Sequence, residues 1–144
     1  VSAESSAGWV VATTHAAWLP DPSGLTRVGW ESIDNAVWDR DASALQMWQN
    51  ATLDQQPRRW VLPLDYQRDL LLVIKERIRA TVVTSRQVRL TETGGATIVA
   101  RRPPGADQLT WTVSVDPGVS LQAPGARDRV EAALASLRAD LGER

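Results

Sequence analysis

The feature that most constrains the fold is a change near residue 65 in the spacing of apolar side chains. Before this point, short runs alternate apolar with other residues and are separated by turn residues, a pattern typical of antiparallel strands. The segment from Asp21 to Gly24 is an expected turn, because its proline presets φ and its glycine accepts positive φ. The expected strands of this first part are residues 8–14, 15–19, 27–30, 36–39, 45–48 and 59–62.

Two later segments have apolar residues three and four positions apart, which predicts amphipathic helices over about 65–79 and 126–141. Asp65 is the expected N-cap of the first helix. Gly142 is expected to end the second helix, because glycine readily adopts the left-handed conformation that follows a helix. The residues expected to be buried are Leu70, Val73, Ile74 and Ile78 in the first helix and Val130, Ala133, Leu134, Leu137 and Leu141 in the second.

Three further alternating runs lie between the two predicted helices, at residues 81–90, 96–100 and 109–115. Gly94-Gly95 and residues 103–105 are the expected turns, so the three strands are predicted to form an antiparallel meander. Strands and helices do not alternate one by one along the chain. The pattern therefore favours the α+β class, antiparallel and β-rich, over a parallel α/β fold.

Composition limits the chemistry that the chain can perform. It has 144 residues, a formal net charge of −1, no cysteine and a single histidine, His15. The absence of cysteine excludes a disulfide framework and a thiolate metal site, and one histidine gives little support for a transition-metal site. No glycine-rich phosphate motif is present, so no cofactor is expected. No apolar run approaches the roughly 20 residues that span a bilayer, and the first residues lack the pattern of a signal peptide. We therefore expect a cytoplasmic protein with no membrane span.

Two segments in the first part carry a resemblance to a known class of domain. They are Val11-Ala12-Thr13-Thr14-His15-Ala16-Ala17-Trp18-Leu19 and Arg27-Val28-Gly29-Trp30-Glu31-Ser32-Ile33. Together they resemble the strand–turn–strand of bacterial pleckstrin-homology-like (PH-like) and GRAM-type domains. The whole chain also resembles an uncharacterised family of small actinobacterial proteins. The resemblance implies a PH-like, partly closed barrel or sandwich over residues 1–79. Residues 80–144 are then expected to add the meander and a C-terminal helix packed on it, within a single domain of residues 1–144.

Trp30 and Ile33 lie three positions apart at an expected bend. We expect them to turn the chain from one sheet to the next and to fill the corner between the sheets with buried apolar surface. The chain has seven tryptophans and no phenylalanine. Tryptophan is therefore expected to fill most of the large aromatic positions of the core.

No catalytic residue is assigned from the sequence. His15 follows a threonine in an expected hairpin, and no Gly-x-Ser-x-Gly elbow is present, so a structural or solvent-facing role is expected for it. Asp39 and Asp41 alternate at the end of a strand and can face one side, where they would hold a divalent cation or share a proton. The alternative is that they are polar residues at an exposed hairpin tip. A small enzyme with a carboxylate and arginine site between Trp30 and Asp41 is therefore one alternative function.

Basic side chains are concentrated between residues 66 and 102, where eight basic and three acidic residues occur, whereas residues 1–65 are net acidic. Arg86, Arg89, Arg101 and Arg102 are expected on one hairpin, where they would bind an anion such as a phosphate or a nucleic acid. The alternative is that these arginines pair with carboxylates of the acidic first half. The signal for nucleic acid is not strong, because the pI is about 5.8 and no aromatic residue occurs between positions 67 and 110.

These observations together favour a non-enzymatic interaction or scaffold domain. The expected partner is another protein, or a second copy of the chain, bound along an exposed strand edge, because an open edge can accept a further strand. The anion-binding hairpin and the small enzyme remain as alternatives.

Overall fold

The computed structural model describes residues 1–50 and 57–142, which form three antiparallel sheets and two α-helices. Sheet A contains β1 (Ser2–Ser5), β2 (Gly8–Ala12), β3 (Ala16–Asp21) and β4 (Gly24–Gly29). Sheet B contains β5 (Ile33–Asp39), β6 (Ala44–Gln49) and β7 (Arg58–Pro63). Sheet C contains β8 (Val82–Arg89), β9 (Gly95–Arg101) and β10 (Thr110–Val115). The helices are α1 (Arg68–Ala80), α2 (Ala126–Asp140) and a short 3₁₀ helix, η1 (Trp30–Ser32).

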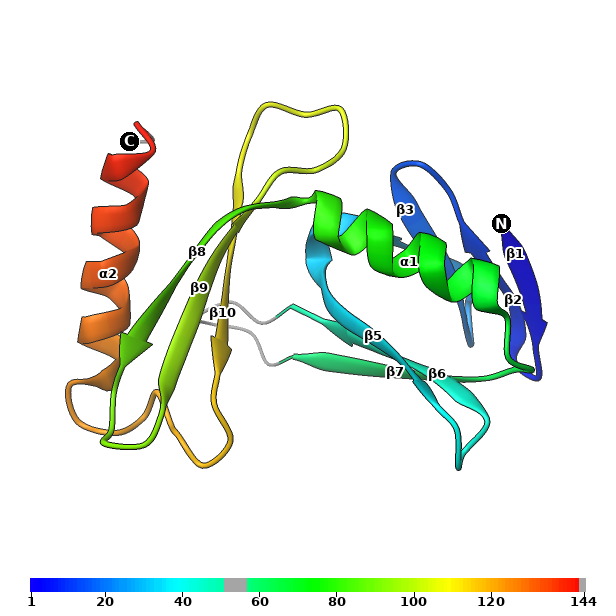
Figure 1. Cartoon of the computed structure of the whole chain (residues 1–144), viewed down its shortest axis with the longest axis horizontal. Coiled ribbons are helices and arrows are strands. Elements are labelled where there is room, and N and C mark those ends of the chain that lie inside the picture. The colour runs from blue at the N-terminus through cyan, green and yellow to red at the C-terminus, as the bar shows by residue number, and fades with distance from the viewer. Residues whose placement is uncertain (51–56, 143–144) are drawn as a thin grey trace.

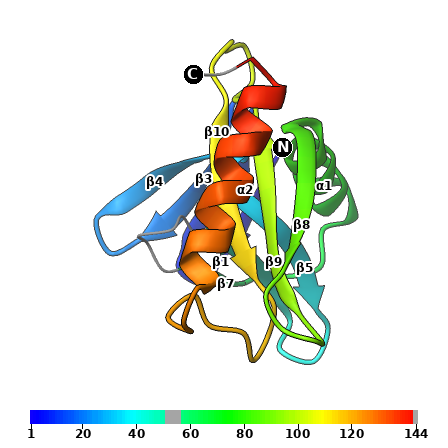
Figure 2. The same ribbon diagram turned by 90° about the vertical axis from the view of Figure 1, so that its left-hand side faces the viewer.

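The sheets are arranged in layers along the longest axis of the molecule. The strand orders are β1-β2-β3-β4 in sheet A, β5-β6-β7 in sheet B and β10-β9-β8 in sheet C. Helix α2 covers one side of sheet C, and sheets A and B with α1 lie on the other side (Figures 1 and 2). The predicted α+β class with antiparallel sheets is confirmed. The strands that the structure describes form three separate sheets and do not close into a barrel.

Trp30 occupies the corner between sheets A and B. It lies in η1, which directly joins β4 to β5, and its side chain is completely buried. Ile33 is also buried, with 1% of its surface exposed. The indole Nε1 of Trp30 donates a hydrogen bond to the carbonyl oxygen of Thr13 at 2.9 Å, which ties the corner to the β2–β3 turn. The predicted role of Trp30 and Ile33 at this bend is confirmed.

Buried apolar side chains form two clusters. The first cluster joins sheets A and B with α1, and the second joins sheet C with α2. Of the seven tryptophans only Trp30 and Trp60 are buried, whereas Trp9 is half exposed and Trp38 packs at the margin of the first cluster. The buried aromatic positions of the core are thus both tryptophan, as expected. Small and aliphatic residues fill the rest, because alternation places tryptophans such as Trp9 on the outer faces of strands.

Helix α1 starts later than predicted, at Arg68, and Gln67 rather than Asp65 occupies the N-cap position without a side-chain cap. Gln67 has an extended backbone, so the chain does not coil before Arg68. The segment ahead of it is held by a contact far away in sequence. Leu64 is buried in the first cluster, and its backbone N–H donates to the carbonyl oxygen of Ser43 at 3.3 Å.

Two details of the second half also differ from expectation. Leu141 is 40% exposed rather than buried, because α2 ends at Asp140 and Leu141 is its C-cap, while Gly142 follows with φ 74° as predicted for a helix stop. The turn after β8 does not include Gly95, which is the first residue of β9. A Cβ at Gly95 would collide with the carbonyl oxygen of Val88, so the two strands require glycine at this crossing.

Candidate interaction surface

A shallow apolar groove, with a free volume of only about 10 Å³, lies between α1 and the β5–β6 hairpin. Helix α1 buries Leu70, Ile74 and Ile78 against the first core cluster and packs chiefly on β5. Leu71 follows Leu70 in the helix and points about 100° away from it, so it is half-buried at the margin of this contact. The groove is lined by Trp38, Leu45, Leu64, Tyr66, Gln67, Leu70 and Leu71.

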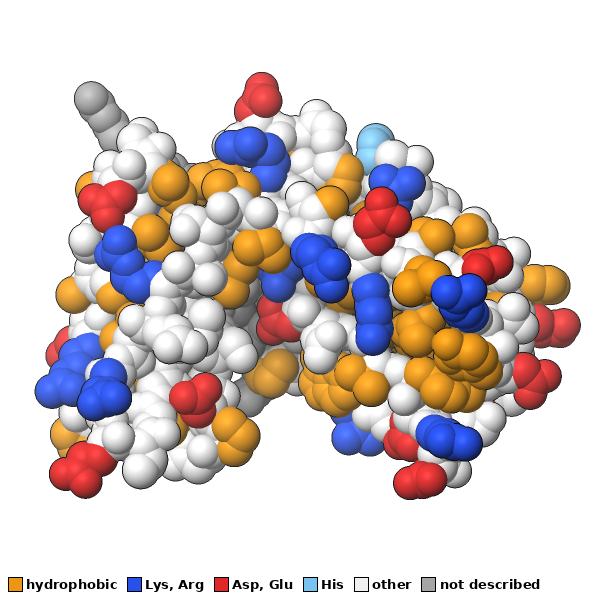
Figure 3. Space-filling model, in the orientation of Figure 1, with side chains coloured by type: hydrophobic (Ala, Val, Ile, Leu, Met, Phe, Trp, Pro, Cys, Tyr) orange, Lys and Arg blue, Asp and Glu red, His pale blue; other side chains and the backbone are white. Residues whose placement is uncertain are grey.

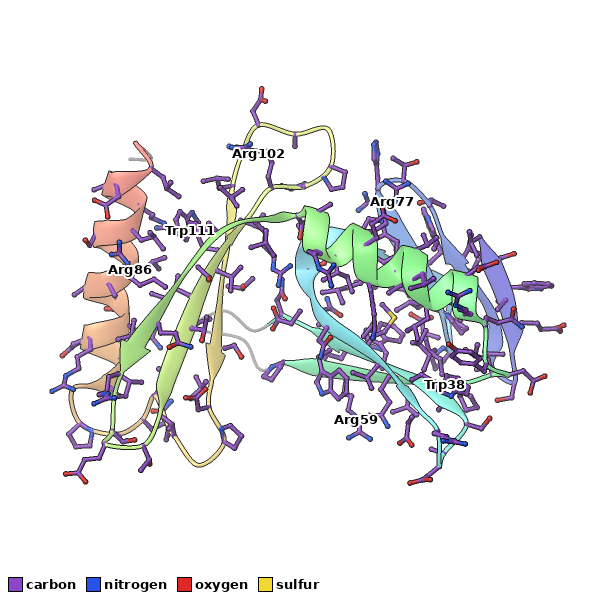
Figure 4. The ribbon with its side chains drawn as sticks, in the orientation of Figure 1. Trp38, Arg59, Arg77, Arg86, Arg102 and Trp111 are labelled. Carbon is purple, nitrogen blue, oxygen red and sulfur yellow. The ribbon has the colours of Figure 1, made fainter. Side chains whose placement is uncertain are left out.

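Two aromatic rings form one wall of the groove. Trp38 of β5 and Tyr66, just before α1, have ring centroids 5.5 Å apart with planes tilted by 57°, an arrangement within the range that aromatic pairs favour. Figure 4 places Trp38 below the first turns of α1. The Trp38 side chain lies opposite Leu45 across the β5–β6 pair, which fixes its position along the sheet. The Trp38 ring of this wall is therefore positioned by a strand within sheet B rather than by a loop.

Apolar side chains also extend out of the groove onto the helix surface. Tyr66 is 55% exposed and Leu72 is 52% exposed. We name the surface formed by Trp38, Tyr66, Leu71 and Leu72 the α1 patch. Figure 3 shows hydrophobic side chains gathered beside α1, bordered by lysine and arginine. Single exposed apolar residues are normal on protein surfaces, but a contiguous group around a groove is typical of an interaction site.

A row of cations runs along α1 beside this patch. Arg68, Lys75 and Arg79 are spaced by seven and four residues, so they share one face of the helix, and all three are exposed. No described carboxylate forms an ion pair with any of them. We name these three residues the basic stripe. The α1 patch and the basic stripe together present apolar and positively charged groups side by side.

The four arginines predicted to bind an anion are spread over sheet C rather than gathered. In the β8–β9 pairing, Arg101 lies opposite Val82 and Arg89 opposite Gly95, seven residues apart along β8, which corresponds to about 23 Å. Arg86 lies between these levels and forms an ion pair with Asp140 of α2 at 2.9 Å. Arg102 is exposed at the start of the β9–β10 loop (Figure 4). Anion binding by Arg89 or Arg102 stays a prediction.

Arg101 is the exception among these arginines because it is buried, at 4% exposure. Its guanidinium donates to Asp34 Oδ1 at 3.2 Å, to the Thr81 hydroxyl at 3.0 Å and to the Ile78 carbonyl at 3.4 Å. Burial raises the pKa of Asp34, which the neighbouring guanidinium only partly offsets, and burial likewise lowers the pKa of Arg101. This pair connects β5 to β9 and to the end of α1, so it joins the two core clusters.

Of the remaining carboxylates in the Trp30–Asp41 region, Asp39 serves the fold. Asp39 accepts hydrogen bonds from the backbone N–H groups of Asp41 and Ala42, each at 3.1 Å, and from the Gln46 side chain at 2.7 Å. Asp39 thereby closes the β5–β6 hairpin, while Asp41 is exposed at its tip. Within residues 1–50 and 57–142, no group of three or more metal-ligating side chains is close enough together to hold an ion. The geometry fits the hairpin-tip alternative for this aspartate pair.

His15 is exposed in the turn between β2 and β3. Its ring lies beside the β9–β10 loop, where a Cβ at Gly105 would be 3.7 Å from its Nε2. No serine or carboxylate hydrogen bonds to it among the described residues, so His15 has the solvent-facing position that the sequence suggested.

Comparison with known proteins identified no matching family model, no curated relative and no similar solved structure. Among the described helices, none is long and apolar enough to cross a membrane.

One feature of the sequence points to the α1 patch. Leu70, Leu71 and Leu72 are consecutive, and successive residues of a helix point about 100° apart, so a single buried face cannot cover all three. At least one of these leucines therefore had to lie near solvent. The participation of Trp38 and Tyr66 had no such signal, because it depends on the packing of α1 across β5.

Proposed function

We propose that this chain is a non-enzymatic interaction domain that binds a partner protein through the α1 patch. The partner segment is apolar with acidic residues beside it, because the patch places exposed apolar side chains next to the basic stripe. The observation that carries the proposal is an apolar groove with the 55% exposed Tyr66 in its wall, next to a helix face on which the 52% exposed Leu72 lies among the cations of the basic stripe. Burial of such side chains supplies affinity, and charge complementarity raises the rate and specificity of association.

The first half of the chain fits this role as a scaffold. We retain the proposal that residues 1–79 are PH-like. It is supported by two antiparallel sheets that share one core and by the helix that follows them. On such a scaffold the groove is held by β5, β6 and α1 together, so little conformational freedom is lost when a partner binds.

A contact along a strand edge is a second candidate, favoured by one observation. Strand β8 is eight residues long, pairs only with β9 among the described strands, and has exposed side chains along most of its length. An added strand from a partner or from a second copy would extend sheet C. Sedimentation velocity over a wide concentration range tests the second copy: a dimer that the substitution Ser85→Pro abolishes supports edge pairing, and a monomer at every concentration refutes it.

The alternative of a small enzyme has less support. Asp34 and Arg101, a described pair of ionisable groups with opposed pKa shifts, are engaged in a buried contact between elements. A catalytic pair is instead expected to line a cavity that substrate can enter. None of the cavities resolved among the described residues is lined by either side chain.

Affinity capture with matched variants tests the proposed function. The tagged chain, the double variant Tyr66→Ser/Leu72→Ser and the control Val61→Ser are used to capture proteins from cells that express the chain. Val61 is also exposed, at 45%, but lies on β7 outside the patch. A partner retained by the wild type and by the control, and lost at least tenfold from the double variant, supports the proposal. Equal recovery by all three proteins contradicts it.

A further inference from the structure

An open cavity of about 330 Å³ lies at the β2–β3 end of sheet A, away from the α1 patch. It is lined by Thr13, Thr14, His15, Ala16, Trp18 and Arg27. These residues come from the β2–β3 turn, β3 and β4. The cavity therefore includes the only histidine of the chain and an arginine that the sequence analysis did not single out.

Strand alternation explains why these side chains converge. Ala17 and Leu19 point into the first core cluster, so Ala16 and Trp18 of the same strand lie on the opposite face of sheet A, where Ala16 is covered and Trp18 is half-buried. Trp18 lies directly opposite Arg27 in the β3–β4 pairing, which places their side chains next to each other on the outer face of sheet A. The half-buried Trp18 ring and the exposed Arg27 guanidinium thus form adjoining walls of the cavity.

The turn that carries the other walls is fixed by hydrogen bonds. The Thr13 hydroxyl donates to the Ala16 carbonyl at 2.9 Å, and the Thr13 carbonyl accepts the 2.9 Å bond from the buried Trp30 indole. The turn is therefore anchored to the corner between sheets A and B. A site held in this way loses little freedom on binding, which favours even a small ligand.

The charge of the cavity walls is positive. Arg27 forms no ion pair with a described carboxylate, and His15 lies beside it among the lining residues. The nearby Glu31 carboxylate lies over Gly29 on the same face of sheet A, but Glu31 is not one of the residues that line the cavity. An arginine beside hydroxyl groups binds a carboxylate or a phosphate by charge-assisted hydrogen bonds.

We infer that this cavity binds a small organic anion in which a carboxylate or phosphate group is attached to a planar ring. The anionic group contacts Arg27, with the Thr14 hydroxyl and His15 within the same walls, and the ring packs on Trp18 in an offset or edge-on arrangement. The volume is at the lower end of the range of roughly 300–1,000 Å³ for ligand sites, so a single-ring compound fits better than a nucleotide. This inference is independent of the α1 patch.

Nuclear magnetic resonance of the single imidazole tests the inference. His15 is the only histidine, so a sample labelled with ¹⁵N-histidine gives one set of ring signals from the cavity itself. The full chain is titrated at fixed pH with phenyl phosphate, benzoate and inorganic phosphate. The variants are Arg27→Gln and the control Arg40→Gln, which removes an exposed arginine from the β5–β6 hairpin.

Saturable shifts of the His15 signals with phenyl phosphate or benzoate support the inference, and the stronger of the two identifies the anionic group. The affinity should fall at least tenfold in Arg27→Gln and stay within twofold of the wild type in Arg40→Gln. Inorganic phosphate should bind at least tenfold more weakly than phenyl phosphate, because it has no ring to pack on Trp18. No saturable shift with either ring compound overturns the inference. The inference is also overturned if Arg27→Gln binds the ring compounds with the affinity of the wild type, or if inorganic phosphate binds as tightly as phenyl phosphate.

Discussion

Replacing Trp30 with alanine is the most direct test of how the first half holds together. The side chain is completely buried at the corner between sheets A and B. A buried tryptophan removes up to about 250 Å² from water, which corresponds to roughly 6 kcal/mol at about 25 cal/mol per Å² as an upper limit. The lost indole bond to Thr13 adds about 1 kcal/mol. Measured substitutions of this type cost about 3–5 kcal/mol, so we expect Trp30→Ala to lower the free energy of unfolding by at least ~3 kcal/mol.

Urea denaturation followed by circular dichroism measures this loss, and Trp30→Phe separates its two parts. Phenylalanine retains most of the buried ring but cannot donate to Thr13, so we expect a loss of about 1–2 kcal/mol. A loss below about 1 kcal/mol for Trp30→Ala would show that the corner does not depend on this side chain.

Three further predictions concern charged groups. Arg101→Met is expected to cost about 3 kcal/mol or more in urea melts, because it leaves Asp34 without its cation; the double variant with Asp34→Asn should cost clearly less than the sum of the single changes. Burial raises the pKa of Asp34 above 3.8, so the folded chain binds the carboxyl proton more tightly than the unfolded chain. The free energy of unfolding should therefore fall as the pH rises from 3.8 through the raised pKa. Asp34→Asn should flatten this part of the stability–pH profile, and an unchanged slope contradicts the assignment of the slope to Asp34. Asp39→Ala is expected to cost about 1–2 kcal/mol through its three lost hydrogen bonds, against less than about 0.5 kcal/mol for the exposed Asp41→Ala; equal losses refute the hairpin role.

The features that sequence predicted well depend on short-range patterns. Alternation and turn residues identified every described strand except β1 (Ser2–Ser5), whose short polar sequence carries no apolar alternation. Trp30 with Ile33 marked the corner because both are large, apolar and close together at a bend. Gly142 marked the end of α2 for an equally local reason, since its positive φ favours glycine.

The features that sequence missed depend on contacts between distant residues. Helix α1 starts at Arg68 rather than near Asp65, and the segment before it is held to Ser43, on another hairpin, through the Leu64 N–H. Arg86 and Arg101 pair with carboxylates 54 and 67 positions away, and no local pattern could assign those partners. The charge distribution suggested pairing with the acidic first half beside the reading as an anion site. Arg101 pairs in that way with Asp34, whereas the partner of Arg86 is Asp140 of α2.

The candidate sites were the least predictable part. The groove of the α1 patch requires β5, the segment before α1 and the helix itself to meet, and the cavity beside Arg27 requires the register that places this residue opposite Trp18. Both depend on which outward-facing side chains become neighbours. Periodicity identifies the outward face of each strand or helix but not its neighbours across the fold.

Binding of a designed probe peptide tests the central claim of an apolar and basic interaction surface most directly. A fluorescent, amphipathic peptide of leucine and glutamate is titrated with the full chain at low and at high salt, beside a matched peptide with lysine in place of glutamate. We predict that the anisotropy of the acidic peptide rises saturably, that salt weakens the binding, and that Tyr66→Ser/Leu72→Ser removes it while Val61→Ser does not. Equal binding of the acidic and basic peptides, or no binding of either, would contradict the account.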